Sequence, residues 1–205
     1  MVAPEAGAVS GLDHAAEAAR IVDAHARRVT LDPISDRGAL ALEDAYGVQG
    51  HVVAARLARG ERVVGWKLGY TSLVMREQMG VDAPNFGPLT DAMLIADGAA
   101  VPASMTQPRV EPEVALRFAS DVPAGADRAA VLAAVGSANA ALEVVDSVWT
   151  DYRFTLEDNT ADGSSAAGVV LGPELPLDLI ADVEVTLLVD GEPAGTGRGS
   201  DASGH

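Results

Sequence analysis

The sequence predicts a mixed α/β fold of the α+β type, in which helices precede a core of short strands. Of the 205 residues, 48% are hydrophobic, which is enough to form a sizeable core. Before Gly60 apolar residues recur at helical spacing, and after it short apolar runs are separated by turn-forming residues. We therefore expect an N-terminal helical region, residues 1–60, and a strand-rich domain, residues 61–205.

Two helices are predicted in the N-terminal region. Apolar residues return every three or four positions in Leu12–Arg28, and a second helix over Leu42–Arg59 ends at Gly60, a residue type that commonly terminates helices. The turn-rich segment 31–38 connects them. We expect these helices to cover the strand-rich domain without forming a separate functional unit.

The strand-rich domain is predicted to contain mostly short strands. The first is Arg62–Leu68, followed by a short helix that Ser72 caps and that reaches Met79, and Val81–Pro88 is expected to be a loop because Pro and Gly punctuate it. The remaining elements are strands at Ala92–Ile95, Arg109–Phe118, Ala140–Val145, Ala167–Leu171 and Val183–Val189, and a helix at Asp127–Val135.

The C-terminal residues contain a hairpin signal. Asp190 and Gly191 follow an apolar run and favour a tight turn, so a returning strand is expected. The residues after Gly191 are rich in glycine and offer no evident partner strand. We therefore expect the chain to be a fragment that lacks the C-terminal part of its domain.

Composition excludes several classes of protein. The net charge of −16 opposes binding to a phosphate backbone, so nucleic acid is not an expected partner. No apolar stretch is long enough to span a bilayer and the N-terminus has no signal pattern, which predicts a cytoplasmic protein without a membrane interaction. Because cysteine is absent, a metal would have to be held by oxygen or histidine ligands, which favours hard cations.

The single lysine of the chain is a candidate catalytic residue. Of the fourteen basic residues only Lys67 is not arginine, and it lies in an apolar run. One interpretation is codon bias and chance. The other is that the site needs a compact amine that can lose its proton when buried, which a guanidinium cannot do.

Three glutamates could share a metal ion. In a strand over Arg109–Phe118, alternation places Glu111 and Glu113 on one face, with their Cα atoms roughly 6–7 Å apart. Apolar neighbours would bury Glu143, and a buried glutamate needs a partner. Together these oxygen ligands would suit Mg²⁺ or Mn²⁺. The alternatives are solvated surface glutamates at 111 and 113 and a structural acid at 143.

A loop of small polar residues, 159–168, precedes a predicted strand. Its hydroxyl and amide groups could donate hydrogen bonds to a carboxylate or an oxyanion, although such segments also form ordinary turns. No dinucleotide, P-loop or Gly-x-Ser-x-Gly pattern occurs, and the histidines lack metal-ligand spacing.

Five motifs occur in an order that resembles the 2-keto-4-pentenoate hydratase and 4-oxalocrotonate decarboxylase group of the fumarylacetoacetate hydrolase superfamily. They are Gly-Trp-Lys-Leu-Gly-Tyr-Thr-Ser at 65–72, Met-Gly-Val-Asp-Ala-Pro-Asn-Phe-Gly at 79–87, Gln-Pro-Arg-Val-Glu-Pro-Glu at 107–113, Leu-Glu-Val-Val-Asp-Ser at 142–147 and Thr-Ala-Asp-Gly-Ser-Ser at 160–165. The resemblance implies a rolled mixed sheet with outer helices, a homo-oligomer, and a fold that continues beyond His205.

The resemblance also implies the roles of individual residues. Glu111, Glu113 and Glu143 match metal ligands for Mg²⁺ or Mn²⁺, and Lys67 and Ser164 match catalytic positions. Substrate contacts are expected from four polar residues, which are Thr71, Ser72, Asn85 and Asp162. The family commonly has aspartate at position 85, arginine at 148 and asparagine at 163, where this chain has Asn85, Val148 and Gly163. Substrate contacts can therefore differ here.

The reaction implied by the resemblance is hydration of a small 2-oxo or 2-enol acid. The preferred substrate is 2-hydroxypenta-2,4-dienoate, which would give 4-hydroxy-2-oxopentanoate during catabolism of aromatic compounds. The alternatives are decarboxylation of 4-oxalocrotonate, carbon–carbon hydrolysis of an acylpyruvate, and an inactive homologue that assembles with a paired hydratase or decarboxylase.

Overall fold

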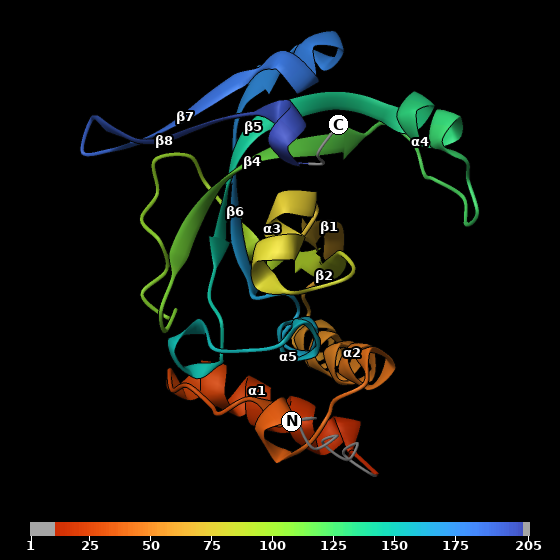
Figure 1. The fold of residues 1–205 in the computed structure, drawn as a ribbon, viewed down its shortest axis with the longest axis vertical. Coiled ribbons are helices and arrows are strands. Elements are labelled where there is room, and N and C mark those ends of the chain that lie inside the picture. Colours follow the sequence, from red (N-terminus) through yellow and green to blue (C-terminus); the bar gives the residue numbers. More distant parts are fainter. Residues whose placement is uncertain (1–10, 203–205) are drawn as a thin grey trace, which may run out of the picture.

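The computed structural model describes residues 11–202, and it places both N-terminal helices at one end of the molecule and the larger sheet at the other, with shorter helices beside the strands (Figure 1). Helices α1 (His14–Arg27), α2 (Leu42–Ala58) and α5 (Leu156–Ala161) form the helical end. Both predicted N-terminal helices are confirmed, and the Asp13 side chain caps α1 by accepting from the Ala16 N–H. Within the described range, no helix is both long and apolar enough to cross a bilayer.

The best-packed core lies at this helical end. Ile21 of α1, Val48 of α2 and Ile34 of a short 3₁₀ helix (Ile34–Arg37) are all essentially inaccessible to solvent. Trp149, which comes shortly after the strand Val135–Val145, packs into the same cluster, and its indole N–H donates to the Asp158 carbonyl oxygen at 2.8 Å. The helices are therefore packed directly against the segment that leads from the sheet to α5.

The main sheet has four strands in the order β3–β6–β5–β4. They are β3 (Leu94–Ile95), β4 (Arg109–Phe118), β5 (Val135–Val145) and β6 (Ala166–Leu175). The β4–β5 and β5–β6 pairs are antiparallel, and β3 lies parallel to β6. The predicted bounds of β4 are confirmed, whereas β5 and β6 are longer than predicted because each gains hydrogen bonds from a neighbouring strand. Helix α4 (Arg128–Ala134), capped by Asp127, connects β4 to β5 as predicted.

A second, two-stranded sheet corrects the prediction of a loop at Val81–Pro88. Strand β1 (Val63–Gly69) pairs antiparallel with β2 (Asn85–Thr90), with Lys67 opposite Gly87. The loop prediction holds for residues 81–84 but was wrong for residues 85–88, because the ladder with β1 satisfies their backbone despite the Gly and Pro residues. Helix α3 (Leu73–Met79) connects the two strands and has the predicted range.

A strand does follow Gly191, as the hairpin signal predicts, although the glycine-rich residues there show no strand pattern of their own. Strand β7 (Glu184–Val189) turns at Asp190 and Gly191, both with positive φ, into β8 (Glu192–Arg198). The hairpin lies beside the upper part of the main sheet in Figure 1. Three 3₁₀ segments complete the fold beyond β5: Thr150–Tyr152, Leu177–Asp182 and Gly199–Ala202.

Candidate active site

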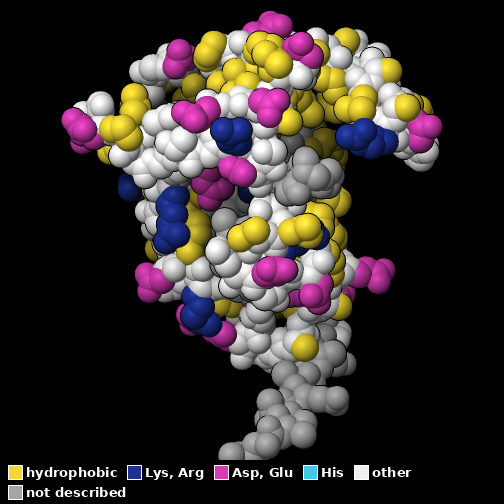
Figure 2. Space-filling view, turned by 45° about the horizontal axis from the view of Figure 1, so that its top comes forward, with side chains coloured by type: hydrophobic (Ala, Val, Ile, Leu, Met, Phe, Trp, Pro, Cys, Tyr) yellow, Lys and Arg dark blue, Asp and Glu magenta, His cyan; other side chains and the backbone are white. Residues whose placement is uncertain are grey.

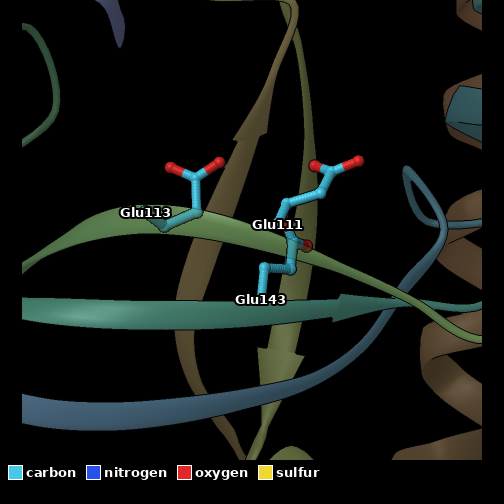
Figure 3. A group of neighbouring side chains, drawn as sticks. All are labelled: Glu111, Glu113 and Glu143. Carbon is cyan, nitrogen blue, oxygen red and sulfur yellow. The ribbon is translucent and has the colours of Figure 1, made fainter. Parts of the chain in front are cut away.

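Three carboxylates converge where β4 and β5 run side by side. Glu111 lies directly opposite Glu143 in the antiparallel ladder, and Glu113 follows one pleat later on the same side of β4 (Figure 3). One carboxylate oxygen from each of the three lies within 4.8 Å of the others. Strand alternation explains Glu111 and Glu113, whereas the placement of Glu143 depends on the register between the two strands.

Burial differs strongly among the three glutamates. Glu111 is exposed, Glu113 is partly buried and Glu143 is only 5% exposed. Burial raises the pKa of Glu143 to about 7, although the Lys67 ammonium nearby lowers it. Burial, followed by the negative charge of Glu111, also raises the pKa of Glu113. The protein alone therefore holds the carboxylates of Glu113 and Glu143 in an environment that disfavours their charge.

One carboxylate oxygen at this site is buried without a hydrogen-bond partner, which a bound cation could supply. Oε1 of Glu143 is buried and has no hydrogen-bond partner among the described residues. Its other oxygen, Oε2, lies 3.3 Å from the Lys67 ammonium. A divalent ion between the three carboxylates would contact an otherwise unsatisfied oxygen and would favour the charged form of each. The residues present therefore fit a hard cation such as Mg²⁺.

Lys67 reaches this group from the other sheet. It lies on strand β1, lines the same cavity as Glu111 and Glu113, and its side chain is only 10% exposed. The ammonium donates to the backbone carbonyl oxygen of Ser164 at 3.0 Å, in addition to its ion pair with Glu143. The lysine therefore lies between the acidic group and the 159–168 loop.

The loop that contains Ser164 has an unusual backbone. Gly163, Ser164 and Ser165 all have positive φ angles, of 72°, 58° and 55°. For a non-glycine residue this conformation costs about 1–3 kcal/mol and must be held by its surroundings. The Ser164 hydroxyl donates to Oδ1 of Asn85 at 3.1 Å, and Nδ2 of Asn159 donates to the Ser165 hydroxyl at 3.0 Å. These contacts keep the Ser164 carbonyl oxygen directed at Lys67.

Two of the predicted substrate contacts lie away from the cavity beside the glutamates. Asn85 is 1% exposed and its amide donates to Asn159 and to Thr160. Asp162 is 5% exposed and accepts hydrogen bonds from the His25 ring and the Val148 N–H. Neither residue lines the cavity. Both instead make hydrogen bonds that hold the neighbouring segments together.

A cavity of about 780 Å³ opens beside the carboxylates. Its wall includes Glu111, Glu113, Lys67 and Ser164, together with the predicted contacts Thr71 and Ser72. The β7–β8 hairpin forms a further part of the wall. Figure 2 shows acidic and basic side chains beside a hollow in the middle of one face, with hydrophobic side chains gathered around the upper rim (Figure 2).

Several residues of this wall were not predicted from the sequence. Tyr70, Arg109, Tyr152 and Asn159 all line the cavity. Burial and the charge of Glu111 raise the pKa of Tyr70 to about 12, so its phenol stays protonated at neutral pH. Arg109 could have been found, because it precedes Glu111 by two positions and therefore shares its face of the strand. Tyr152 follows no such local pattern.

In sequence the chain is similar to hydratases of hydroxydienoates. It is 37% identical over 195 residues to a 2-hydroxyhexa-2,4-dienoate hydratase from Comamonas testosteroni, covering 91% of this chain and 74% of that protein. It is 38% identical over 191 residues to a 2-hydroxypent-2,4-dienoate hydratase from Pseudomonas putida, covering 90% of this chain and 86% of that protein. No protein-family profile matches the chain.

A solved structure has the same fold. The 4-oxalocrotonate decarboxylase from Pseudomonas putida G7, complexed with magnesium and adipate, superimposes with a TM-score of 0.86 at 26% sequence identity. The superposition covers 94% of this chain and 75% of the decarboxylase. The predicted rolled mixed α/β fold is thereby confirmed.

Proposed function

Because the chain belongs to the family of 2-keto-4-pentenoate hydratases and 4-oxalocrotonate decarboxylases, we propose that it is a divalent-metal-dependent hydratase of 2-hydroxypenta-2,4-dienoate. The observation that carries the proposal is the group formed by Glu111, Glu113 and Glu143 around an unsatisfied buried oxygen, with the Lys67 ammonium 3.3 Å from one carboxylate. The product is 4-hydroxy-2-oxopentanoate.

The three glutamates would hold Mg²⁺ or Mn²⁺ through carboxylate oxygens. When bound, such an ion polarises the 2-oxygen of a chelating 2-oxo or 2-enol acid and stabilises negative charge on it. The magnesium complex of the related decarboxylase supports this choice of metal. The exposed position of Glu111 beside the cavity leaves room for the substrate to approach the metal.

Lys67 would act as the group that moves protons. The enol proton of the substrate leaves its 2-oxygen while C5 gains a proton, which gives a conjugated ketone. Water then adds, with its hydroxyl going to C4 and its proton to C3. The Lys67 ammonium can take part because it is a compact donor held by the Ser164 carbonyl oxygen and Glu143 on the cavity wall. Ser164, Thr71 and Ser72 would help to orient the substrate.

The test compares two freshly generated substrates, 2-hydroxypenta-2,4-dienoate and 4-oxalocrotonate, with and without Mg²⁺. We expect hydration of the dienoate that depends on the metal, and loss of both metal binding and activity in Glu113→Ala. Lys67→Met should bind metal but lose at least about 100-fold in kcat, the usual size of a proton-transfer contribution. Glu43→Gln, an exposed change on α2, is the control and should keep both properties.

Decarboxylation of 4-oxalocrotonate is the second candidate. It is favoured by the fold match to the decarboxylase, because the same stabilised enolate can accept the electrons left by departing CO₂. Release of CO₂ from 4-oxalocrotonate without hydration of the dienoate would replace the first candidate by the second. If a folded, metal-loaded protein converts neither compound, the catalytic proposal is wrong and an assembly role becomes the better hypothesis.

We also propose that the protein is cytoplasmic, that it forms a homo-oligomer, and that its substrate is a small acid. Association with a paired hydratase or decarboxylase is the remaining partner hypothesis. Light scattering of the purified protein, alone and mixed with such an enzyme, tests both forms of assembly.

A further inference from the structure

Tyr70 is a cavity residue whose hydroxyl group has no hydrogen-bond partner. It directly follows strand β1, which carries Lys67, and it lines the same cavity as the glutamates. Among the residues that the structure describes, none forms a hydrogen bond with the Tyr70 hydroxyl. The hydroxyl oxygen of Tyr152, also on the cavity wall, instead lies 3.0 Å from the Val145 carbonyl oxygen and 3.1 Å from that of Gln107. Of these two phenols, that of Tyr70 is therefore the one that can donate to a ligand.

The backbone at Tyr70 has a conformation that is costly for a bulky residue. Its φ angle is 56°, in the left-handed region that favours glycine. Seven non-glycine residues of the described range 11–202 have positive φ, and four of them line this cavity: Tyr70, Tyr152, Ser164 and Ser165. Such strain gathers at functional sites, where a side chain must be directed at a ligand. The turn of the chain at Tyr70 therefore indicates that the direction of the phenol matters.

The phenol lies near the exposed member of the glutamate group. Burial is the largest cause of the raised pKa of Tyr70, and the charge of Glu111 is the next, so the hydroxyl is within electrostatic range of that carboxylate. Lys67 instead contacts Glu143, the buried member of the group. The ammonium and the phenol are thus two donors placed at different carboxylates. A small acid held at the glutamates can meet them at different atoms.

We infer that Tyr70 is a catalytic residue that donates a hydrogen bond to the 2-oxygen of the substrate as negative charge develops on that oxygen. The inference rests on the proposed function, because the substrate must be held at the glutamates through this oxygen. The phenol keeps its proton, so Tyr70 forms and breaks no covalent bond. A hydrogen bond to a charged oxygen is stronger than one to a neutral carbonyl. The phenol therefore stabilises the enolate more than the ketone, which lowers the barrier between them.

Two unreactive ligands test this inference by binding. Oxalate presents a charged oxygen where the enolate would have one, and 2-oxopentanoate presents a neutral carbonyl oxygen there. Isothermal titration at one Mg²⁺ concentration would compare the wild-type protein with Tyr70→Phe, which removes only the hydroxyl. Loss of a hydrogen bond to a charged group weakens binding roughly tenfold to a hundredfold, and we expect this loss for oxalate. Binding of 2-oxopentanoate should weaken only a few-fold, and its retention shows that the variant is folded.

Controls separate the hydroxyl from the metal and from tyrosine removal in general. Tyr46→Phe removes a hydroxyl outside the cavity and keeps the ring that stacks on Phe86, so it should bind both ligands as the wild-type protein does. Titration of Mg²⁺ alone should give the same affinity in Tyr70→Phe and the wild-type protein. With the dienoate, Tyr70→Phe should lose at least about tenfold in kcat with little change in KM.

The outcomes distinguish this inference from the proposed function. If Tyr70→Phe weakens 2-oxopentanoate as much as oxalate, or weakens neither, the inference is wrong and the proposed function stands. An oxalate loss of the same size in Tyr46→Phe also overturns the inference. If neither ligand binds the wild-type protein in Mg²⁺, the proposed function fails, and this inference fails with it.

Discussion

Gly87 is the residue at which strand β2 approaches the Ser164 loop most closely. A Cβ atom at this position would lie 1.9 Å from the Gly163 carbonyl oxygen, which is backbone and cannot move aside easily. Only glycine therefore allows β2 to pass beneath the loop that directs the Ser164 carbonyl oxygen at Lys67.

Gly87→Ala is expected to destabilise the protein and displace this loop. Overpacking of this kind costs about 1–3 kcal/mol, and urea unfolding would measure it. The control is Gly50→Ala in α2, where nothing lies within 4 Å of the added Cβ. Removal of a helical glycine should instead stabilise the protein by roughly 0.5–1 kcal/mol. Equal stability of Gly87→Ala and the wild-type protein would contradict the close approach.

The His25–Asp162 pair predicts a pH-dependent contribution to stability. Burial alone lowers the pKa of His25, but the charge of Asp162 and its 2.8 Å hydrogen bond outweigh burial and raise it above the ordinary value. A raised folded-state pKa means that the contribution is fully present below the unfolded pKa of about 6.5 and is lost as the pH rises through the folded value.

The measurement is the free energy of unfolding as a function of pH in the wild-type protein and in His25→Gln. We expect part of the decrease in stability above about pH 6.5 to disappear in the variant. His51→Gln, an exposed change on α2, should retain the wild-type profile. Identical profiles for His25→Gln and the wild-type protein would show that the pair does not titrate as described.

At the scale of elements, α5 connects the helical end to the active site. Thr155 and Asp158 form a capping box at its N-terminus, and the Asp158 carboxylate also accepts from the backbone N–H and the hydroxyl of Ser35. Asp158 is completely buried. One carboxylate therefore ties the start of α5 to the connection between α1 and α2, and the Ser164 loop follows directly from the end of this helix.

Asp158→Ala should be strongly destabilising. It removes the acceptor for the N–H and hydroxyl groups of Ser35 and Thr155. Hydrogen bonds to a charged group are worth about 1.5–3 kcal/mol each, so we expect a loss of at least about 3 kcal/mol in chemical denaturation. Asp127→Ala removes the exposed cap of α4 and should cost only about 1 kcal/mol. Comparable losses in the two variants would mean that Asp158 acts only as a helix cap.

At the scale of the whole molecule, the proposed metal site joins two sheets. Its carboxylates come from β4 and β5, whereas Lys67 comes from β1. An ion that binds the folded state and not the unfolded chain stabilises the entire fold. Metal binding should therefore be visible in global unfolding.

Mg²⁺ at a hundredfold excess over its Kd should raise the free energy of unfolding by about 2.7 kcal/mol. Chelation with EDTA should reverse the gain. Glu143→Gln should abolish most of it, whereas Glu43→Gln should show the full increase. A Mg²⁺ effect of the same size in both variants would place the binding site elsewhere.

The sequence by itself determined the features that depend on neighbouring residues in the chain. The helical periodicity of α1 and α2, the Asp127 cap of α4 and the alternation of β4 are all local patterns, and the structure confirms these elements within a few residues. The family motifs were likewise readable, because they are contiguous runs in a fixed order.

The features that only the tertiary structure determined depend on partners that are distant in sequence. Strands β2 and β8 exist because β1 and β7 supply their hydrogen bonds, and no local propensity reveals such a partner. The register of β4 with β5 places Glu143 opposite Glu111, and the packing of two sheets brings Lys67 to Glu143 across 76 positions of the chain. Hydrogen bonds and charges act between residues that are distant in the chain. The grouping of the three glutamates with Lys67 could therefore be proposed from the sequence, but its geometry depends on the fold.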